Sequence, residues 1–159
     1  MGITTLSLTG GGVVLIDEED AVLLSQWKWT RWERPKYNSG PYAVRVTEYL
    51  GKKREIRMHR LLSNAPRGVE VDHRNGDGLD NRKQNLRLCT RSQNRANSRC
   101  RSVSQTGVKG VRQSGLGFRV DTSYQGRRVR SRTFQTITEA AQWYKEYALR
   151  RFGEFARLV

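Results

Sequence analysis

Short runs of alternating apolar and polar residues dominate the chain, and this pattern favours strands joined by tight turns. Near the N-terminus, residues 13–17 predict a strand, and residues 17–27 predict a short helix with acidic side chains in its first turn. Residues 42–46 and 54–58 predict a hairpin that turns near Gly51. The first 68 residues are therefore expected to form a small β-rich module.

The tryptophans of this module have two interpretations. Trp27, Trp29 and Trp32 follow the predicted helix closely, and such a group can stack on nucleic acid bases. A small module also needs the apolar area of its aromatic residues, which favours at least two of them in the core.

The middle of the chain changes pattern. Residues 69–73 and 85–90 predict two strands, separated by a loop that is dense in Gly, Asn and Asp. Residues 91–99 then predict a short basic helix, with Thr90 or Ser92 as its N-cap. The order is strand, loop, strand, helix.

The C-terminal third predicts three strands followed by a long helix. The strands are expected at 107–112, 117–123 and 127–134, and the helix at 136–153. Thr136 and Glu139 have the spacing of a capping box. Every fourth residue on one helix face is apolar, which predicts a stripe that packs on the sheet: Ala140, Tyr144, Ala148 and Phe152.

These patterns predict an α+β fold built from small modules. A β-rich module is expected at 1–68, a strand–loop–strand–helix motif at 69–100, and a three-stranded antiparallel sheet packed on one helix at 108–159. Residues 101–107 are expected to be a linker.

Charge indicates the class of partner. The 159 residues carry 30 Lys and Arg against 15 Asp and Glu, a formal net charge of +15. Such an imbalance predicts attraction to a polyanion, most often nucleic acid. Basic and acidic side chains number 11 and 8 in residues 1–70, 8 and 3 in 71–105, and 11 and 4 in 106–159, so the basic excess grows toward the C-terminus.

Other partners and cofactors are disfavoured. No apolar run approaches the roughly 20 residues that span a bilayer, and no signal-peptide pattern opens the chain. We therefore expect a cytoplasmic location and no membrane partner. Cys89 and Cys100 form no CxxC pair, and two Cys with two unpaired His do not make a structural zinc site. We therefore expect reduced thiols and no zinc.

Candidate chemistry lies in the stretch VDHRNGDGLDNRKQNLRLCTRSQN, residues 71–94. Asp72 and His73 end the first predicted strand, and Asn94 lies on the predicted helix. If strand and helix pack together, one carboxylate and one carboxamide oxygen form a weak site of hard ligands, which suits Mg²⁺ and leaves room for phosphate oxygens. His73 points to the other side of the strand, and an unperturbed pKa of about 6.5 suits a general base.

The same stretch resembles the motif of HNH nucleases, in particular homing endonucleases of the phage and intron type. His73 matches the first His of the motif, Asn85 its middle Asn, and Asn94 its third position, while Asp72 matches the Asp that precedes the first His. The resemblance implies a ββα-metal fold in which His73 activates water. It further implies that Asp72 and Asn94 hold one divalent metal, and that Asn85 braces the loop to orient the His73 ring.

Other polar residues near the motif have more ordinary interpretations. Asn75 and Asn81 lie in a Gly- and Asp-rich turn and are expected to be structural. Asp72 and His73 can also form a plain ion pair at a strand end. His59, in the stretch MHRLL, is interpreted as structural or as a phosphate contact rather than as catalytic.

The C-terminal strands carry a regular array of arginines. Arg128, Arg130 and Arg132 alternate with Val129, Ser131 and Thr133, and period two places the three arginines on one sheet face. Residues 119, 121 and 123 alternate likewise, which adds Arg119, Asp121 and Ser123. Such a face can enter a major groove, where Arg reads guanine; the alternative is a solvated basic strand.

Residues 108–159 resemble the DNA-binding domain of plant ethylene-response factors, the Apetala class, which also follows HNH motifs in phage-type endonucleases. The resemblance rests on VKGVR, GF, GRRVRSRTF and the helix that ends in GEFARL. It implies DNA contacts from Lys109, Arg112, Asp121, Ser123, Arg128 and Arg130. Ser123 stands where that family has Arg, and Arg130 where it often has Trp, so the family's target sequence does not transfer.

Together these features predict a DNA endonuclease with Mg²⁺, or Mn²⁺ in its place, as cofactor and double-stranded DNA as partner. By family chemistry it leaves 5′-phosphate and 3′-hydroxyl ends. Whether the protein forms a homodimer is left open by the sequence. The alternative is a DNA-binding protein that kept a vestigial nuclease fold, against which the intact set of Asp72, His73, Asn85 and Asn94 argues. RNA binding is disfavoured because no aromatic RNP-type motif is present.

Overall fold

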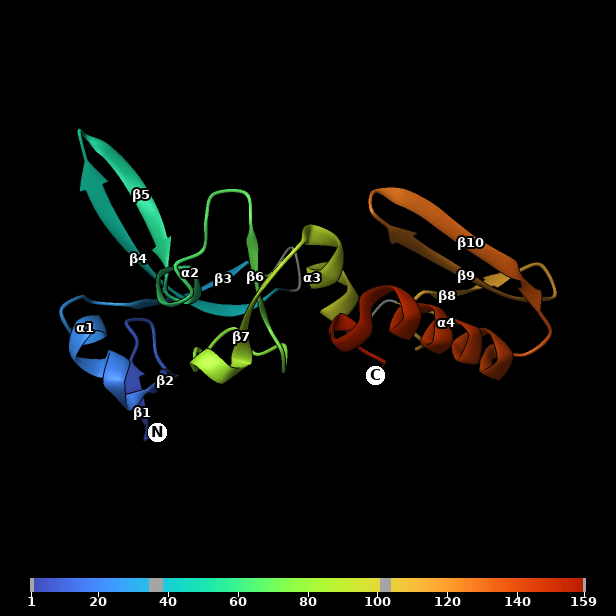
Figure 1. Ribbon diagram of the computed structural model, residues 1–159, viewed down its shortest axis with the longest axis horizontal. Coiled ribbons are helices and arrows are strands. Elements are labelled where there is room, and N and C mark those ends of the chain that lie inside the picture. Colours follow the sequence, from blue (N-terminus) through green and yellow to red (C-terminus); the bar gives the residue numbers. More distant parts are fainter. Residues whose placement is uncertain (1, 35–38, 101–103, 159) are drawn as a thin grey trace. The chain divides into compact units, whose positions relative to one another are not determined.

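In the computed structural model, which describes residues 2–34, 39–100 and 104–158, the strands pair into four small antiparallel sheets (Figure 1). With the helices beside them, these sheets give the predicted α+β fold. Contacts divide the chain into two units, residues 1–89 and 90–159. Each unit has its own hydrophobic core.

The first unit begins with a two-stranded sheet, β1 (Ile3–Ser7) and β2 (Val13–Asp17). A 3-10 turn at Glu18–Asp20 leads into helix α1 (Ala21–Ser25), as the acidic start of the predicted helix indicated. Strand β2 and the helix were predicted, whereas β1 was not, because TTLS carries no clear alternation.

A three-stranded sheet follows, in the order β3 (Thr30–Arg34), β4 (Ser39–Tyr49), β5 (Lys52–Arg57). The predicted turn between β4 and β5 lies at Leu50 and Gly51, both with positive φ, which is the two-residue turn that matches strand twist. Helix α2 (Met58–Leu62) comes directly after β5. The sequence predicted Met58 as strand, and here it begins the helix and is fully buried.

The core of the first unit gathers side chains from β2, α1, β4 and α2. Trp29 is buried in it and donates its Nε1–H to the carbonyl oxygen of Leu24 at 2.9 Å. Trp27 is partly buried against the same core, and the guanidinium of Arg45 lies 4.1 Å from its ring. Trp32 is half-buried and pairs with Tyr42 across β3 and β4, with Arg57 over its ring.

The first unit ends with the hairpin β6 (Glu70–His73) and β7 (Leu86–Cys89). The loop between them docks on β2: Leu15 N–H donates to Leu79 O at 2.9 Å, and Asn81 N–H donates to Leu15 O at 2.8 Å. A 3-10 turn at Lys83–Asn85 then leads into β7. Both strands lie where the sequence predicted them.

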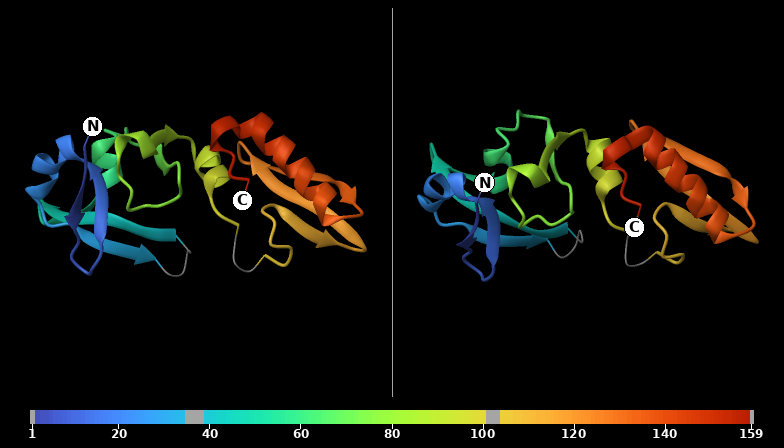
Figure 2. Two further views of the ribbon diagram at one scale, coloured as in Figure 1. Left: turned by 90° about the horizontal axis from the view of Figure 1, so that it is seen from below. Right: turned by 60° about the horizontal axis from the view of Figure 1, so that its bottom comes forward.

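The second unit begins with helix α3 (Arg91–Asn97), which Thr90 caps in a full capping box with Gln93. A three-stranded sheet follows: β8 (Val111–Ser114), β9 (Gly117–Tyr124) and β10 (Arg127–Phe134), with β9 in the middle. Helix α4 (Ile137–Phe152) runs along one face of this sheet in both views of Figure 2. It begins with the predicted capping box of Thr136 and Glu139.

The predicted apolar stripe of α4 is the core of this unit. Ala140, Tyr144, Ala148 and Phe152 are all buried, packed against Val111, Val120 and Phe134 of the sheet. Ala96 of α3 belongs to the same cluster. The chain turns at Gly153, where φ is positive, into a 3-10 turn at Gly153–Phe155.

The contacts divide the chain at a different place from the one that the sequence pattern predicted. The division after Cys89 groups α3 with the C-terminal sheet, whereas the sequence pattern grouped residues 69–100 as one motif. The boundaries at 68, 100 and 107 stay a prediction. Residues 101–103 of the expected linker lie outside the described residues. None of the helices in the described ranges is long and apolar enough to cross a bilayer.

Candidate active site

Both histidines of the chain meet in one aromatic cluster in the first unit. His73 ends β6, His59 lies on α2, and Tyr42 lies on β4. The ring centroids of the two histidines are 5.1 Å apart in an edge-on arrangement, and Tyr42 lies 5.3 Å from His59 and 5.9 Å from His73. Both histidines are 5% exposed. Three segments that are distant in sequence therefore enclose the predicted general base.

Asn81 fixes the tautomer of His73. Its Oδ1 lies 3.3 Å from His73 Nε2, while its Nδ2 faces Gly78 O at 3.4 Å. Because a carboxamide oxygen only accepts hydrogen bonds, the His73 nitrogen that faces it carries the proton. Nδ1 of His73 is then the atom with the lone pair that can accept a proton.

Burial keeps the His73 ring neutral. Desolvation is the largest influence and lowers the pKa of His73 below its usual value. The Asn81 hydrogen bond and the carboxylates of Asp72, Asp77 and Asp80 oppose this shift in pKa. A neutral imidazole at neutral pH is the form that a general base requires.

Asn85 braces the loop that follows His73. Its Oδ1 accepts the backbone N–H of Asn75 at 3.1 Å, and its Nδ2 donates to Asn75 Oδ1 at 3.0 Å and to Asp80 O at 2.7 Å. Its backbone oxygen accepts from Arg74 N–H at 2.9 Å. Asn75 also accepts from Asp77 N–H, as a turn residue does. Asn85 thus ties both ends of the loop to the start of β7.

Gly78 lets this loop approach β4 closely. A Cβ at position 78 would meet the backbone oxygen of Pro41, and would lie 2.8 Å from ring carbons of Tyr42. Gly78 is buried although it lies in a loop. The loop and the aromatic cluster are therefore packed without room for a side chain between them.

Asp72 forms a buried ion pair across the β6–β7 hairpin. Arg87 Nε and Nη2 lie 2.8 and 2.7 Å from Asp72 Oδ2, and the side chains of Arg87 and Asp72 are 7% and 5% exposed. The two residues are directly opposite in the register. The sequence did not indicate this partner of Asp72.

Asp72 carries a carboxylate and Asn94 a carboxamide, and oxygen atoms of both kinds are ligands that hard divalent cations prefer. A carboxylate has two oxygens and about four acceptor sites, so an arginine on Oδ2 is compatible with a metal on the same group. Asn94 lies in α3 of the second unit and is half-buried. Within residues 2–34, 39–100 and 104–158, no three His, Cys, Asp or Glu side chains gather as a metal cage would.

The predicted basic face exists in the second unit. Strand pairing places Arg119 opposite Arg112, Asp121 opposite Arg130, and Ser123 opposite Arg128. Asp121 lies at its centre, where it binds Arg112 Nη2 and Arg128 Nε at 2.7 Å each, with Arg130 Nε at 3.7 Å. The hydrogen bond from Arg128 is the main reason that the pKa of Asp121 is lowered.

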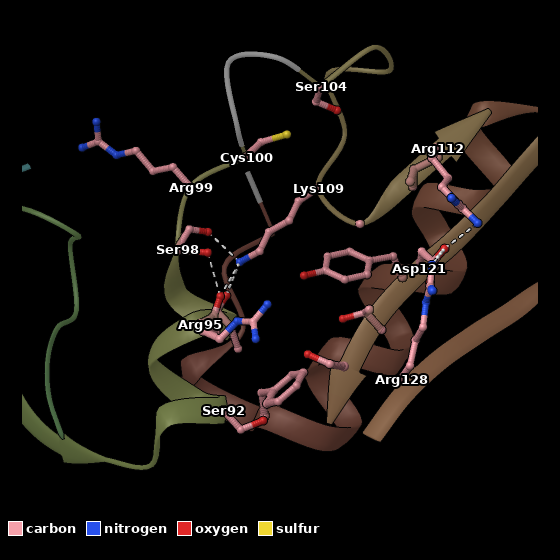
Figure 3. Close-up of a pocket in the computed structure, with 17 residues that line it drawn as sticks. Ser92, Arg95, Ser98, Arg99, Cys100, Ser104, Lys109, Arg112, Asp121 and Arg128 are labelled. Carbon is pink, nitrogen blue, oxygen red and sulfur yellow. Dashed lines mark hydrogen bonds and ion pairs between the residues drawn. The ribbon is translucent and has the colours of Figure 1, made fainter. Parts of the chain in front are cut away.

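This face borders a cleft of about 650 Å³ (Figure 3). Figure 3 shows Arg112, Asp121 and Arg128 on one side of the cleft and Arg95 and Arg99 on the other. Lys109 is differently engaged: its ammonium donates to the backbone oxygens of Arg95, Ala96 and Ser98. It therefore holds the C-terminal end of α3, in the manner of a capping lysine.

Arg132 does not share the face of Arg128 and Arg130, and that prediction was wrong. The register shifts between Arg130 and Thr133, so Thr133 takes the place opposite Arg119. The Ser131 hydroxyl fills the irregularity by accepting Val120 N–H at 2.9 Å. Arg132 turns to the helix side, 5.2 Å from the Phe134 ring, in a shallow hollow that Trp143 also lines.

Sequence patterns alone missed the contributions of four residues to the site. Asn81 looked like a turn residue, and its burial comes only from the docking of its loop on β2. Tyr42 and His59 lie 31 and 14 residues before His73, and no spacing rule connects them to it. Arg87 lies between apolar residues in a strand, and this alternation is also what a solvent-facing residue shows.

Comparison with known proteins fits this geometry. The family model described as "HNH endonuclease" matches residues 64–96, which include the β6–β7 hairpin and most of α3. An uncharacterized HNH endonuclease of Acanthamoeba polyphaga mimivirus is 30% identical over 136 residues, covering 81% of this chain and 69% of the viral protein. No solved structure gave a significant match. The chain, which carries its Asp–His pair and its Asn85 brace within the matched segment, belongs to the HNH endonuclease family.

Proposed function

We propose that this nuclease hydrolyses phosphodiester bonds of double-stranded DNA with one divalent metal ion, and that His73 is its general base. The observation that carries the proposal is the His73 ring: it is buried, neutral, held by Asn81 at Nε2, and adjacent to Asp72. A homing-type nuclease of a phage or mobile element fits the motif and the basic second unit.

His73 acts through Nδ1. This nitrogen takes a proton from water as the water oxygen bonds to phosphorus and the bond from phosphorus to the 3′ oxygen breaks. The 3′ oxygen leaves as a hydroxyl after it takes a proton from solvent, and the phosphate stays on the 5′ end. His73 keeps its Nε2 proton throughout, in the hydrogen bond that Asn81 Oδ1 accepts.

Asp72 and Asn94 are the proposed metal ligands. A divalent ion held there, Mg²⁺ or Mn²⁺, would supply positive charge to the phosphate oxygens and the leaving group. Arg87 fixes the Asp72 rotamer and neutralises part of its charge. HNH nucleases generally depend on a divalent metal.

The decisive test is cleavage of supercoiled plasmid in Mg²⁺, Mn²⁺ or EDTA, read as nicked, linear or uncut DNA. Wild type is expected to cut only with metal, and His73→Ala is expected to cut slower by roughly 10²–10⁴-fold. DNA affinity should be retained. Gln84→Ala, exposed and close to the same motif, is the matched control. Normal cutting by His73→Ala would exclude it as the base.

The proposed metal ligands are tested separately, by the dependence of the cleavage rate on the Mg²⁺ concentration. Asp72→Asn keeps an acceptor for Arg87, and Asn94→Ala removes the carboxamide. Each is expected to raise the Mg²⁺ concentration for half-maximal rate. If both titrate like wild type, the metal is bound elsewhere. A chain that binds DNA but never cuts it would support the alternative, a DNA-binding protein with a vestigial nuclease fold.

We further propose that residues 108–159 form an Apetala-type DNA-binding domain that reads the duplex with its sheet face. The arginines around Asp121 support this, because they are held with their guanidinium groups on one surface. Arg128→Ala and Arg130→Ala are expected to cost about 1–3 kcal/mol on the preferred site and little on random duplex.

Arg132→Ala is the matched control for this test, since it lies on the same strand but on the helix side. Affinities are measured on specific and random duplexes at two salt concentrations. Equal losses on both duplexes would make Arg128 and Arg130 general phosphate contacts, whose removal only flattens the salt dependence.

A further inference from the structure

His59 is held rigidly beside the proposed base. It lies on α2 directly after Met58, which is fully buried in the core together with the partly buried Leu61 and Leu62. This anchoring fixes the helix, and the His59 ring meets the His73 ring edge-on at 5.1 Å. Tyr42 contacts both rings from β4. His73 therefore has an aromatic wall on two sides.

The His59 side chain is an unusual choice for a purely structural position. Its Nδ1 is buried and has no hydrogen-bond partner among the described residues. Burying an unpaired polar atom costs stability, and an apolar ring would avoid that cost. The contacts that His59 makes with His73 and Tyr42 come from its ring, so a role at this position belongs to the ring rather than to the unpaired nitrogen.

Its surroundings also keep His59 uncharged. Desolvation, followed by the charges of His73, Arg57 and Arg60, lowers the pKa of His59 to about 3. A neutral ring beside His73 does not oppose the positive charge that His73 gains when it takes a proton. A lysine or arginine in this place would oppose it.

We propose that His59 is a positioning residue for the reaction: with Tyr42 it forms a neutral aromatic wall that fixes the ring plane of His73 and aims Nδ1 at the attacking water. The proposal rests on the proposed role of His73 as base. Asn81 fixes the tautomer, and the wall fixes the ring orientation that the long 3.3 Å hydrogen bond leaves loose.

A direct phosphate contact is the competing interpretation of His59. The exposed area of its Nδ1 is close to zero, and the side chain as a whole is 5% exposed. The ring is thus placed to touch the base rather than the substrate. The two interpretations differ in what they change, because a positioning residue affects the chemical step and a phosphate contact affects DNA affinity.

The test compares His59→Leu, which removes the ring, with His59→Phe, which keeps a planar ring but no nitrogen. Single-turnover nicking of supercoiled plasmid in Mg²⁺ gives the rate at saturating enzyme, and a binding titration in EDTA gives DNA affinity. His59→Leu is expected to cut at least tenfold slower with affinity within twofold of wild type. His59→Phe is expected to cut at least fivefold faster than His59→Leu.

Two outcomes of this comparison overturn the proposal. Equal losses of DNA affinity in both variants would make His59 a phosphate contact. Equal losses of rate in both variants would show that the nitrogen, not the ring, is needed. Tyr42→Leu against Tyr42→Phe tests the second side of the wall in the same way, and supplies the answer if His59→Leu does not fold.

A readout without cleavage separates this proposal from the proposed function. The ring nitrogens of His73 are followed by NMR in the full chain labelled with ¹⁵N-histidine, and His73→Ala assigns the signals. Wild type is expected to show one sharp set of His73 ring signals, and His59→Leu signals broadened by exchange between ring orientations. Unchanged His73 signals in a folded His59→Leu would overturn the wall, whether or not the wild type cuts DNA.

Discussion

Both histidines of the chain are buried, and burial of an imidazole couples its protonation to folding. In the folded state the pKa of His59 is about 3, whereas an unfolded histidine has a pKa near 6.5. Below pH 6.5 the unfolded chain binds a proton that the folded chain does not. The stability associated with His59 is therefore fully present above pH 6.5 and declines as pH falls toward 3.

This linkage predicts a difference between wild type and His59→Phe. Urea unfolding at pH 7.0 and 4.5 measures the free energy of unfolding of each. The wild type is expected to lose more stability over this interval, by up to about 1.4 kcal/mol for each pH unit below 6.5. Equal losses in the two proteins would mean that His59 titrates in the folded state with an ordinary pKa.

At the residue scale the sequence predicted the motif positions but not their neighbours. Asp72, His73 and Asn85 are close together in the chain, so their spacing alone connects them. Tyr42, His59 and Asn81 reach His73 only because β4, α2 and the loop are packed by the core of the first unit. Contacts of this kind depend on tertiary packing, which residue spacing does not record.

Among the elements, the loop from Arg74 to Asn81 depends most on a single small residue. Gly78 lies against Pro41 and Tyr42 of β4 with no room for a Cβ. A larger residue must push the loop away from the sheet or displace the Tyr42 ring. Either movement would also disturb Asn81, three residues further along the chain.

Gly78→Ala is accordingly expected to lower the free energy of unfolding by about 1–3 kcal/mol, the usual cost of overpacking, and to slow plasmid nicking. Gly40→Ala is the matched control, because the φ of Gly40 lies outside the left-handed region and a methyl group there would meet no atom within 4 Å. Thermal unfolding and nicking rates check both. A fully stable and active Gly78→Ala would show that the loop adjusts freely.

The sequence predicted strands and helices correctly where their positions depend on interactions between residues close together in the chain. The Thr136 capping box and the apolar stripe of α4 depend on neighbours within four residues. Arg132 was placed on the wrong face because period two assumes a regular strand. The irregularity at Ser131 arises from a side chain bonding to a neighbouring strand, and alternation carries no sign of it.

At the scale of the whole molecule, helix α3 belongs to the second unit because it makes core contacts and hydrogen bonds with the rest of that unit. Ala96 lies in the core cluster, and its backbone oxygen accepts Arg157 N–H at 3.1 Å. The Ser92 hydroxyl accepts Gln125 N–H at 3.3 Å. Lys109 also binds the last turn of α3.

A fragment of residues 90–159 is therefore expected to be more stable than one of residues 101–159. The shorter fragment loses Ala96 and five hydrogen bonds to α3, three of them from Lys109. Together these contacts are worth at least about 2 kcal/mol, which lowers Tm by on the order of 10 °C or more. Calorimetry of both fragments tests this. Equal Tm values would place the boundary of the folded unit after α3, as the sequence pattern suggested.

Lys109 has a consequence for how such nucleases exchange parts during evolution. Recombination between residues 98 and 108 would separate the ammonium from the three peptide oxygens that it binds, so a hybrid gene joined there would inherit a helix end without its cap. A crossover between Cys89 and Thr90 would keep the capping box, the helix and Lys109 in one inherited piece. Hybrid nucleases joined at that peptide bond should retain folded recognition modules more often than those joined in the linker.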